Sequence, residues 1–199
     1  YNWGEYTGEN ILREFEEKTG AKVVMENFDS NEQMYIKVAN GEAYDILVPS
    51  DYMIQRLIQE GYLQKLDHSK LDCLDKLCDD VVGLPYDPGN EYSIPYFWGS
   101  VGIVYDKTKV DLEDLEREGF DIFKDQKYKG QIYLYDSERD SFMMALKALG
   151  YSMNTENEDE LQAAYEWLVE CVQTMEPEIV TDEIIDNMAQ GRKALGLIY

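Results

Sequence analysis

The sequence has a single histidine, His68, among its 199 residues. A histidine-rich metal site or a histidine-dependent hydrolase would therefore rest on one residue, which lies in the polar segment 65–70 and outside any motif of such enzymes. Three cysteines are present, Cys73, Cys78 and Cys171, with no C-x-x-C spacing, so at least one is unpaired. A P-loop, a G-x-S-x-G motif and a G-x-G-x-x-G motif are also lacking. We therefore expect no metal, no cofactor and no catalytic residue.

Basic residues are scarce. The chain has 18 Lys and Arg against 41 Asp and Glu, a formal net charge of −23. A nucleic-acid partner would require a basic footprint, so we expect none. An acidic surface attracts cations and raises their encounter rate, although solubility alone also explains the charge. Long apolar runs are lacking too, so no membrane-spanning segment is expected. The chain opens at Tyr1 without the features of a signal peptide, which we expect either to have been removed or to lie outside the given sequence.

Segments with strand patterns alternate with segments of helical spacing. Strands are expected at residues 1–3, 21–25, 44–48, 101–105, 131–135 and 194–199. Helices are expected from Ile11 to Thr19, from a capping box at Ser30 to Gly41, and over 53–61, 111–129, 137–150, 157–174 and 181–191. This alternation predicts an α/β fold with mostly parallel sheets flanked by helices. The apolar final strand has no closing helix, so we expect a C-terminal portion to be missing.

Ligands of open α/β sheets bind beyond the carboxyl ends of the strands. The residues that follow the expected strands are dominated by aromatic side chains and carboxylates: Trp3, Gly4, Glu5 and Tyr6; Ser50, Asp51 and Tyr52; Asp136, Ser137, Glu138 and Asp140; and Tyr199. Trp98 lies just before the expected crossing between lobes. Ring faces attract ammonium groups, carboxylates give them charge-assisted hydrogen bonds, and methylenes pack on aromatic walls. The pattern therefore favours an organic cation as ligand.

Each of these residues also has a structural interpretation. Trp3 suits a hydrophobic core, and Ser50 and Asp51 suit a helix cap. Asp136, Ser137 and Asp140 suit the first turn of a helix, where the helix dipole favours them. Paired carboxylates also raise a glycosidase hypothesis, but two acids four residues apart on one helix do not oppose each other across a substrate.

Several ordered segments resemble one known family. They are Tyr1-Asn2-Trp3-Gly4-Glu5-Tyr6, the segment Phe28-Asp29-Ser30-Asn31-Glu32-Gln33-Met34-Tyr35, the segment 44–52, Tyr92-Ser93-Ile94-Pro95-Tyr96-Phe97-Trp98-Gly99, and the stretches 134–146 and 194–199. In order and spacing they resemble the bacterial spermidine/putrescine-binding proteins of ABC transporters. The resemblance covers essentially the whole chain, and that family is about half as long again.

The resemblance implies a type II periplasmic-binding fold of two lobes that close on the ligand, with the first lobe over 1–104 and a partial second lobe over 105–199. It implies a polyamine ligand, spermidine or putrescine, delivered to a membrane permease by a monomer in the periplasm or outside the cell, with or without a lipid anchor. It places ligand contacts at Trp3, Gly4, Tyr6, Ser50, Tyr52, Ser137, Asp140 and Tyr199, with Asp51, Asp136, Glu138 and Trp98 as weaker candidates. The same scaffold with an amino acid, sugar, thiamine or iron as ligand is the alternative. Arg139, beside the expected site, would suit an anion or pair with Asp140.

Overall fold

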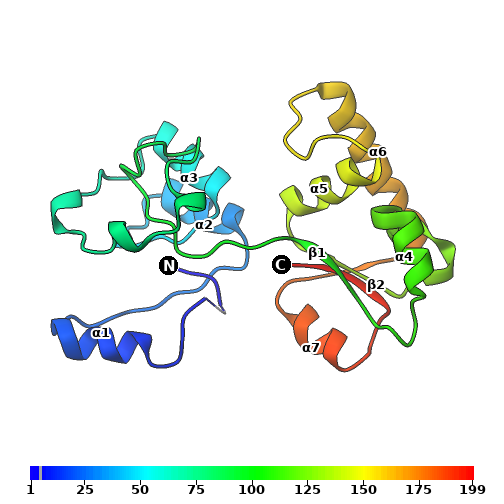
Figure 1. The fold of residues 1–199 in the computed structure, drawn as a ribbon, viewed down its shortest axis with the longest axis horizontal. Coiled ribbons are helices and arrows are strands. Elements are labelled where there is room, and N and C mark those ends of the chain that lie inside the picture. Colours follow the sequence, from blue (N-terminus) through cyan, green and yellow to red (C-terminus); the bar gives the residue numbers. More distant parts are fainter. Residues whose placement is uncertain (5) are drawn as a thin grey trace. The chain divides into compact units, whose positions relative to one another are not determined.

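The computed structural model describes residues 1–4 and 6–199, so Glu5 of the opening motif lies outside the described residues. The chain forms two compact units, Tyr1–Trp98 and Gly99–Tyr199, which are drawn as ribbons in Figure 1. The expected boundary after residue 104 would divide strand β1 (Gly102–Tyr105), which belongs to the second unit because it pairs there with β4 (Leu195–Ile198). That the two units are the lobes of a binding protein stays a prediction.

The first unit is built on three α-helices: α1 (Ile11–Thr19), α2 (Asn31–Ala39) and α3 (Asp51–Gln59). The Ser30 half of the expected capping box forms at the start of α2, where the Ser30 hydroxyl accepts a hydrogen bond from the Gln33 amide at 3.2 Å. Helix α1 buries none of its residues. A core forms instead where α2 and α3 meet the N-terminus, and its fully buried side chains include Met34, Met53 and Leu57.

None of the strands expected at 1–3, 21–25 and 44–48 forms as a regular strand. Instead, Tyr1 and Asn2 bond to both neighbouring segments: the Val48 amide donates to the Tyr1 carbonyl at 3.0 Å, and the Asn2 amide donates to the Glu26 carbonyl at 3.0 Å. An isolated parallel bridge joins Asn2 to Asn27. These bonds bring Asn2, Asn27 and Val48 close together, so the segments that follow them start near one another. No continuous ladder of backbone hydrogen bonds joins the described residues of these segments.

The remainder of the first unit, residues 60–98, consists of loops with three short 3₁₀ helices: η1 (His68–Lys70), η2 (Leu74–Lys76) and η3 (Asp79–Val81). One buried carboxylate organises the turn after them. Asp87 accepts hydrogen bonds from the amides of Glu91, Tyr92 and Ser93 at 2.8–3.0 Å and from the Ser93 hydroxyl at 2.8 Å. These bonds replace the water that a buried carboxylate loses and fix the start of the aromatic segment 92–98.

The second unit contains a four-stranded sheet in the order β1-β4-β2-β3, with β2 at Ile132–Tyr135 and β3 at Glu178–Val180. Strand β2 runs parallel to both β3 and β4, whereas β1 is antiparallel to β4. The predicted mostly parallel sheet is therefore confirmed. The strands expected at 101–105, 131–135 and 194–199 form within one residue of those bounds, but β3 was not anticipated.

Helices cover both faces of this sheet. In Figure 1, α4 (Leu112–Glu118), α5 (Glu138–Ala148) and α6 (Glu158–Met175) lie on one side and α7 (Glu183–Ala189) lies on the other. Two 3₁₀ helices, η4 (Gly119–Lys124) and η5 (Gln126–Tyr128), connect α4 to β2. The expected α/β layering is thus present, and the helix expected over 111–129 is divided into three shorter pieces.

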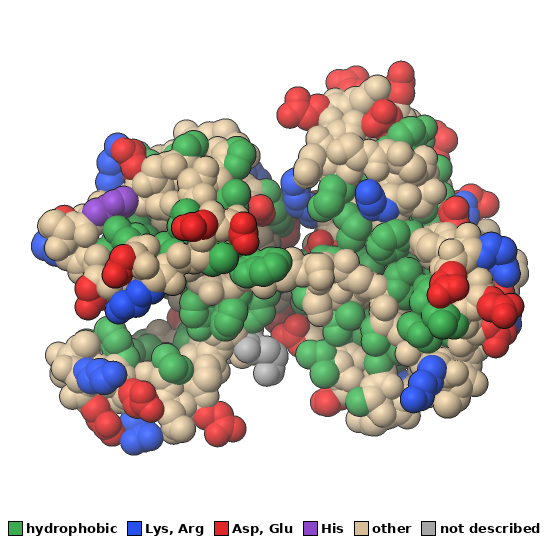
Figure 2. Space-filling model, viewed as in Figure 1, with side chains coloured by type: hydrophobic (Ala, Val, Ile, Leu, Met, Phe, Trp, Pro, Cys, Tyr) green, Lys and Arg blue, Asp and Glu red, His purple; other side chains and the backbone are tan. Residues whose placement is uncertain are grey.

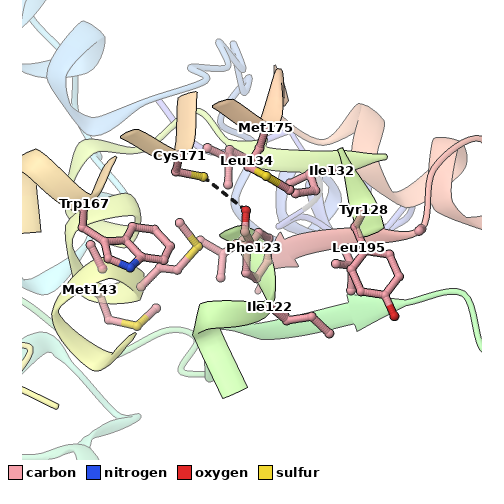
Figure 3. Close-up of a cluster of buried hydrophobic side chains, with 14 of the residues drawn as sticks. Ile122, Phe123, Tyr128, Ile132, Leu134, Met143, Trp167, Cys171, Met175 and Leu195 are labelled. Carbon is pink, nitrogen blue, oxygen red and sulfur yellow. Dashed lines mark hydrogen bonds between the residues drawn. The ribbon is translucent and has the colours of Figure 1, made fainter. Parts of the chain in front are cut away.

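The main hydrophobic core lies between the sheet and the α5/α6 face. Ile132, Leu134 and Leu195 point into it from the strands, because alternate side chains of a strand face the same side. Phe123 of η4 and Cys171 of α6 meet at its centre, where the thiol contacts the Phe123 carbonyl at 3.4 Å (Figure 3). On the opposite face, Gly196 of β4 lies directly beneath Ile184 of α7, where a Cβ atom would come within 2.6 Å of the Ile184 Cδ1 atom.

Candidate ligand-binding site

The carboxyl ends of β2 and β4 bring predicted site residues together in the second unit. The two strands are parallel, with Ile132 paired to Leu195 and Tyr133 paired to Gly196. The chain leaves β2 toward Ser137 and leaves β4 at Tyr199, so both residues lie at the same edge of the sheet. Helix α5 begins there and carries Asp140 in its first turn.

Tyr199 and Asp140 form a hydrogen bond, in which the phenol donates to a carboxylate oxygen of Asp140. Tyr199 is 52% exposed as a whole residue. Desolvation by burial, followed by the hydrogen bond with Asp140, raises the pKa of Tyr199 well above its ordinary value. The tyrosine therefore stays protonated and fixes the position of a carboxylate that is partly open to solvent.

Ser137 has a structural role that the sequence also allowed. Its hydroxyl caps α5 by accepting a hydrogen bond from the Asp140 amide at 3.3 Å. Asp136 and Glu138 beside it are exposed. Arg139 hydrogen bonds to Asn154 at 3.5 Å. Ligand contacts by Ser137, Asp136 and Glu138 stay predictions.

A second tyrosine–aspartate pair at this edge was not identified from the sequence. The Tyr135 hydroxyl at the end of β2 donates to Asp182 at 3.2 Å, and the Tyr135 ring meets the Tyr199 ring edge-on with centroids 5.1 Å apart. Asp182 follows β3 just as Ser137 follows β2. The rule that located Ser137 would also have located Asp182, had the three-residue strand β3 been recognised.

In the first unit, a buried amide joins two predicted site residues. The Asn31 side chain, 4% exposed, donates hydrogen bonds to the Ser50 hydroxyl and the Tyr52 hydroxyl, both at 3.0 Å. Its carbonyl oxygen accepts from the Ser50 amide at 3.0 Å, and Tyr52 also donates to Glu32 at 2.8 Å. Ser50 stands at the start of α3 without capping that helix through its side chain. The helix-cap interpretation therefore does not explain the Ser50 hydroxyl.

Aromatic rings gather around the other predicted residues of this unit. The Trp3 ring lies 4.5 Å from the Phe28 ring and 6.0 Å from the Tyr6 ring, centroid to centroid. Tyr6 also meets the Phe97 ring edge-on at 5.2 Å, and its carbonyl accepts a hydrogen bond from the Tyr96 hydroxyl at 2.5 Å. Trp3 is half-buried against the core of the unit, so it packs there while part of the residue stays open to solvent.

Three further candidates of the first unit are exposed: Gly4, Asp51 and Trp98. Trp98 has 78% of its surface open to solvent. Asn31 could not be identified as a site residue from the sequence, because an asparagine in the first turn of a helix is expected to take part in capping that helix. The binding role of each residue in both units stays a prediction.

Acidic side chains are spread over both units on the face seen in Figure 2 and do not gather in one patch. Within the residues 1–4 and 6–199, no group of three or more His, Cys, Asp and Glu is placed to hold a metal ion. None of the helices in the described part of the chain combines the length and the apolar composition that crossing a membrane requires. The chemistry available at the strand ends is that of aromatic rings, hydroxyl groups and carboxylates.

Residues 10–199 match the family model described as bacterial extracellular solute-binding protein. The chain belongs to this family. Members of this family bind solutes for transport, and the predicted class of protein is thereby confirmed.

Similar proteins agree with this assignment. The chain is 38% identical, over its whole length, to the spermidine/putrescine-binding periplasmic protein of Escherichia coli, of which it covers 57%. Among solved structures, the spermidine/putrescine ABC transporter substrate-binding protein PotD of Streptococcus pneumoniae is 38% identical, with a TM-score of 0.75, and the match covers 99% of this chain and 60% of that one. The TpPotD lipoprotein of Treponema pallidum is 29% identical with a TM-score of 0.85, covering 100% of this chain and 62% of that one. The predicted fold class is confirmed, and the chain spans about three fifths of the length of these solved structures.

Proposed function

We propose that this solute-binding chain captures polyamines, spermidine or putrescine, outside the cell or in the periplasm and delivers them to the permease of an ABC importer. The observation that carries the proposal is the Tyr199–Asp140 pair at the carboxyl ends of parallel strands, which presents a positioned carboxylate beside an aromatic ring. The relatives named for spermidine and putrescine support the same ligand class.

The chemistry of the second unit suits an alkyl ammonium ion. Asp140 supplies the negative charge, and Tyr199 orients that carboxylate while keeping part of its ring exposed. A charge-assisted hydrogen bond to a desolvated ammonium is stronger than a neutral one, and methylene groups gain by lying on the ring. An uncharged or anionic solute would leave the negative charge of this carboxylate without a counter-charge.

The first unit carries an aromatic and hydroxyl set of its own. Trp3 presents a half-buried ring whose orientation is fixed by Phe28 and Tyr6. Ser50 and Tyr52 present hydroxyl groups held in place by the buried Asn31 amide. Rings of this kind attract cations by roughly 0.5–2 kcal/mol each. The arrangement supports recognition of an amine with an apolar stem.

Substitution of Asp140 tests the proposal. In the complete natural protein, Asp140→Asn removes the charge but keeps the shape, and we expect polyamine affinity to fall roughly 30-fold or more, because a desolvated ammonium loses its counter-charge. Asp159→Asn is the matched control, since Asp159 occupies the first turn of α6 as Asp140 occupies that of α5. Equal affinities of the two variants in calorimetric titrations would remove Asp140 from the site.

A thermal-shift panel separates polyamines from other solutes. Polyamines should raise the unfolding temperature of the complete protein in proportion to their affinity, whereas amino acids, sugars, thiamine and Fe³⁺ should leave it unchanged. We also infer that the chain has no catalytic task, since Asp140 lies in the first turn of α5 and Asp136 just before its capping residue, so that the two acids do not oppose each other across a substrate. Turnover of chromogenic glycosides would contradict that inference.

A further inference from the structure

Asp182 lies at the same sheet edge as Asp140 but follows a different strand. Strand β3 runs parallel to β2, with Tyr135 paired to Val180, and Asp182 comes two residues after that pair. The Tyr135 hydroxyl donates to the Asp182 carboxylate at 3.2 Å. Because the Tyr135 ring meets the Tyr199 ring at 5.1 Å, the residues form one continuous series: Asp182, Tyr135, Tyr199, Asp140.

Local backbone structure does not explain the Asp182 carboxylate. Asp182 precedes α7 at the capping position, yet its side chain makes no capping hydrogen bond. The neighbouring Glu183 instead accepts hydrogen bonds from the amide and the hydroxyl of Thr181, at 3.0 and 2.7 Å. The partner of Asp182 is the end of strand β2 rather than its own helix, and the side chain is exposed to solvent.

The series presents two carboxylates separated by aromatic surface. A tyrosine hydroxyl occupies one acceptor direction of each carboxylate, and an ionised carboxylate has about four. Tyr135 is 5% exposed and Tyr199 is 52% exposed, so of the two tyrosines between the acids Tyr199 is the one that a ligand can reach. The complementary ligand has two ammonium groups joined by a short apolar chain, since each charge meets a carboxylate and the methylenes meet the ring.

We propose that Asp182 is a second ammonium-binding carboxylate of this site, which selects diamine and polyamine ligands over monoamines. This inference rests on the proposed function, because it assigns the second charge of the same ligand. It identifies Asp140 and Asp182 as the two anionic ends of one subsite, with Tyr135 holding Asp182 in position.

The test compares putrescine, a diamine, with 1-butylamine, a monoamine of the same chain length, in calorimetric titrations of the complete natural protein. The measured quantity is the ratio of their affinities. We expect Asp182→Asn to reduce this ratio at least tenfold, whereas Asp186→Asn, which removes the same charge from an exposed position on the same helix, leaves it unchanged. Tyr135→Phe keeps the charge of Asp182 and removes only its hydrogen bond, so its ratio should lie between those of Asp182→Asn and the wild type.

Each other outcome overturns a distinct statement. An unchanged ratio in Asp182→Asn removes Asp182 from the site and leaves the proposed function intact. If Asp182→Asn and Tyr135→Phe reduce the affinity ratio equally and also lower the unfolding temperature without ligand equally, then the Tyr135–Asp182 hydrogen bond is only structural and the inference is overturned. Failure of the wild-type protein to bind putrescine overturns the proposed function and this inference with it.

Discussion

Gly196 offers a test of the packing that positions Tyr199. It lies in the middle of β4, between Val104 of β1 and Tyr133 of β2. A Cβ atom added at this position would lie 2.6 Å from Ile184 Cδ1 and 3.2 Å from Val104 Cγ1. Ile184 is fully buried, so its side chain has little space into which to move.

We expect Gly196→Ala to destabilise the second unit. Overpacking of a close-packed interior costs about 1–3 kcal/mol, and the lower entropy of the unfolded alanine chain offsets about 0.4–1 kcal/mol of it. The net loss is about 1–2 kcal/mol, which lowers the unfolding temperature of a domain of this size by roughly 4–15 °C. Urea denaturation followed by circular dichroism measures the free energy of unfolding directly.

Two further variants make the Gly196 test specific. Gly102→Ala introduces the same methyl group in β1, where no atom beyond the adjacent residues lies within 4 Å of the added Cβ, and should not destabilise the protein. Ile184→Val removes the Cδ1 atom that causes the clash, so the double variant Gly196→Ala/Ile184→Val should lose less stability than the sum of the two single changes. A Gly196→Ala protein as stable as Gly102→Ala would refute the packing described for β4 and α7.

Three other predictions concern single side chains. Hydrogen bonds from Lys127, then from Arg117, lower the pKa of Asp114 to about 2 from its ordinary 3.8. The ionised Asp114 therefore stabilises the folded protein fully above about pH 4, and this stabilisation is lost as the pH falls toward 2. Asp114→Asn should flatten a plot of unfolding temperature against pH in this range, and an unchanged plot would contradict the lowered pKa. Burial raises the pKa of the Cys171 thiol to about 11. A thiol reagent at pH 8 should therefore label the exposed Cys78 in the folded protein and Cys171 only after unfolding. Equal labelling rates of Cys78 and Cys171 in the folded protein would be inconsistent with the buried core. Trp3→Ala should weaken polyamine binding severalfold, since one cation-attracting ring is lost, and an unaltered dissociation constant would exclude Trp3 from the site.

Much of the secondary structure follows from local patterns. Helices such as α5 and α6 could be predicted because apolar residues at helical spacing and a capping residue are both local signals. The buried strands β2 and β4 could be predicted because an apolar run marks them. Strand β3 could not, since three residues are too few to show a periodicity.

The missing strands at 21–25 and 44–48 of the first unit show a different limit. Hydrogen bonds of a strand join it to partners that are distant in the sequence, and an apolar run does not reveal whether such a partner is present. Val24 and Ile46 lie in the two expected strands, yet 79% and 70% of their surfaces are exposed. Their residue types favour a strand, but within the described residues the backbone of these two segments pairs only with Tyr1 and Asn2.

The same distinction applies to the candidate site. Asp140 and Tyr199 could be predicted together because each follows a strand that the sequence reveals, and parallel strands end at one edge. Asp182 was missed because its strand was missed. Asn31 was missed because its role depends on Ser50 and Tyr52, about twenty residues away, and not on the turn of helix that contains it.

The position of a bound polyamine tests the central claim most directly. A crystal structure of the complete natural protein with spermidine should place an ammonium nitrogen within hydrogen-bonding distance, about 2.7–2.9 Å, of an Asp140 carboxylate oxygen, with methylene carbons against the Tyr199 ring. Spermidine bound elsewhere, with Asp140 and Tyr199 still bonded only to each other, would contradict the account.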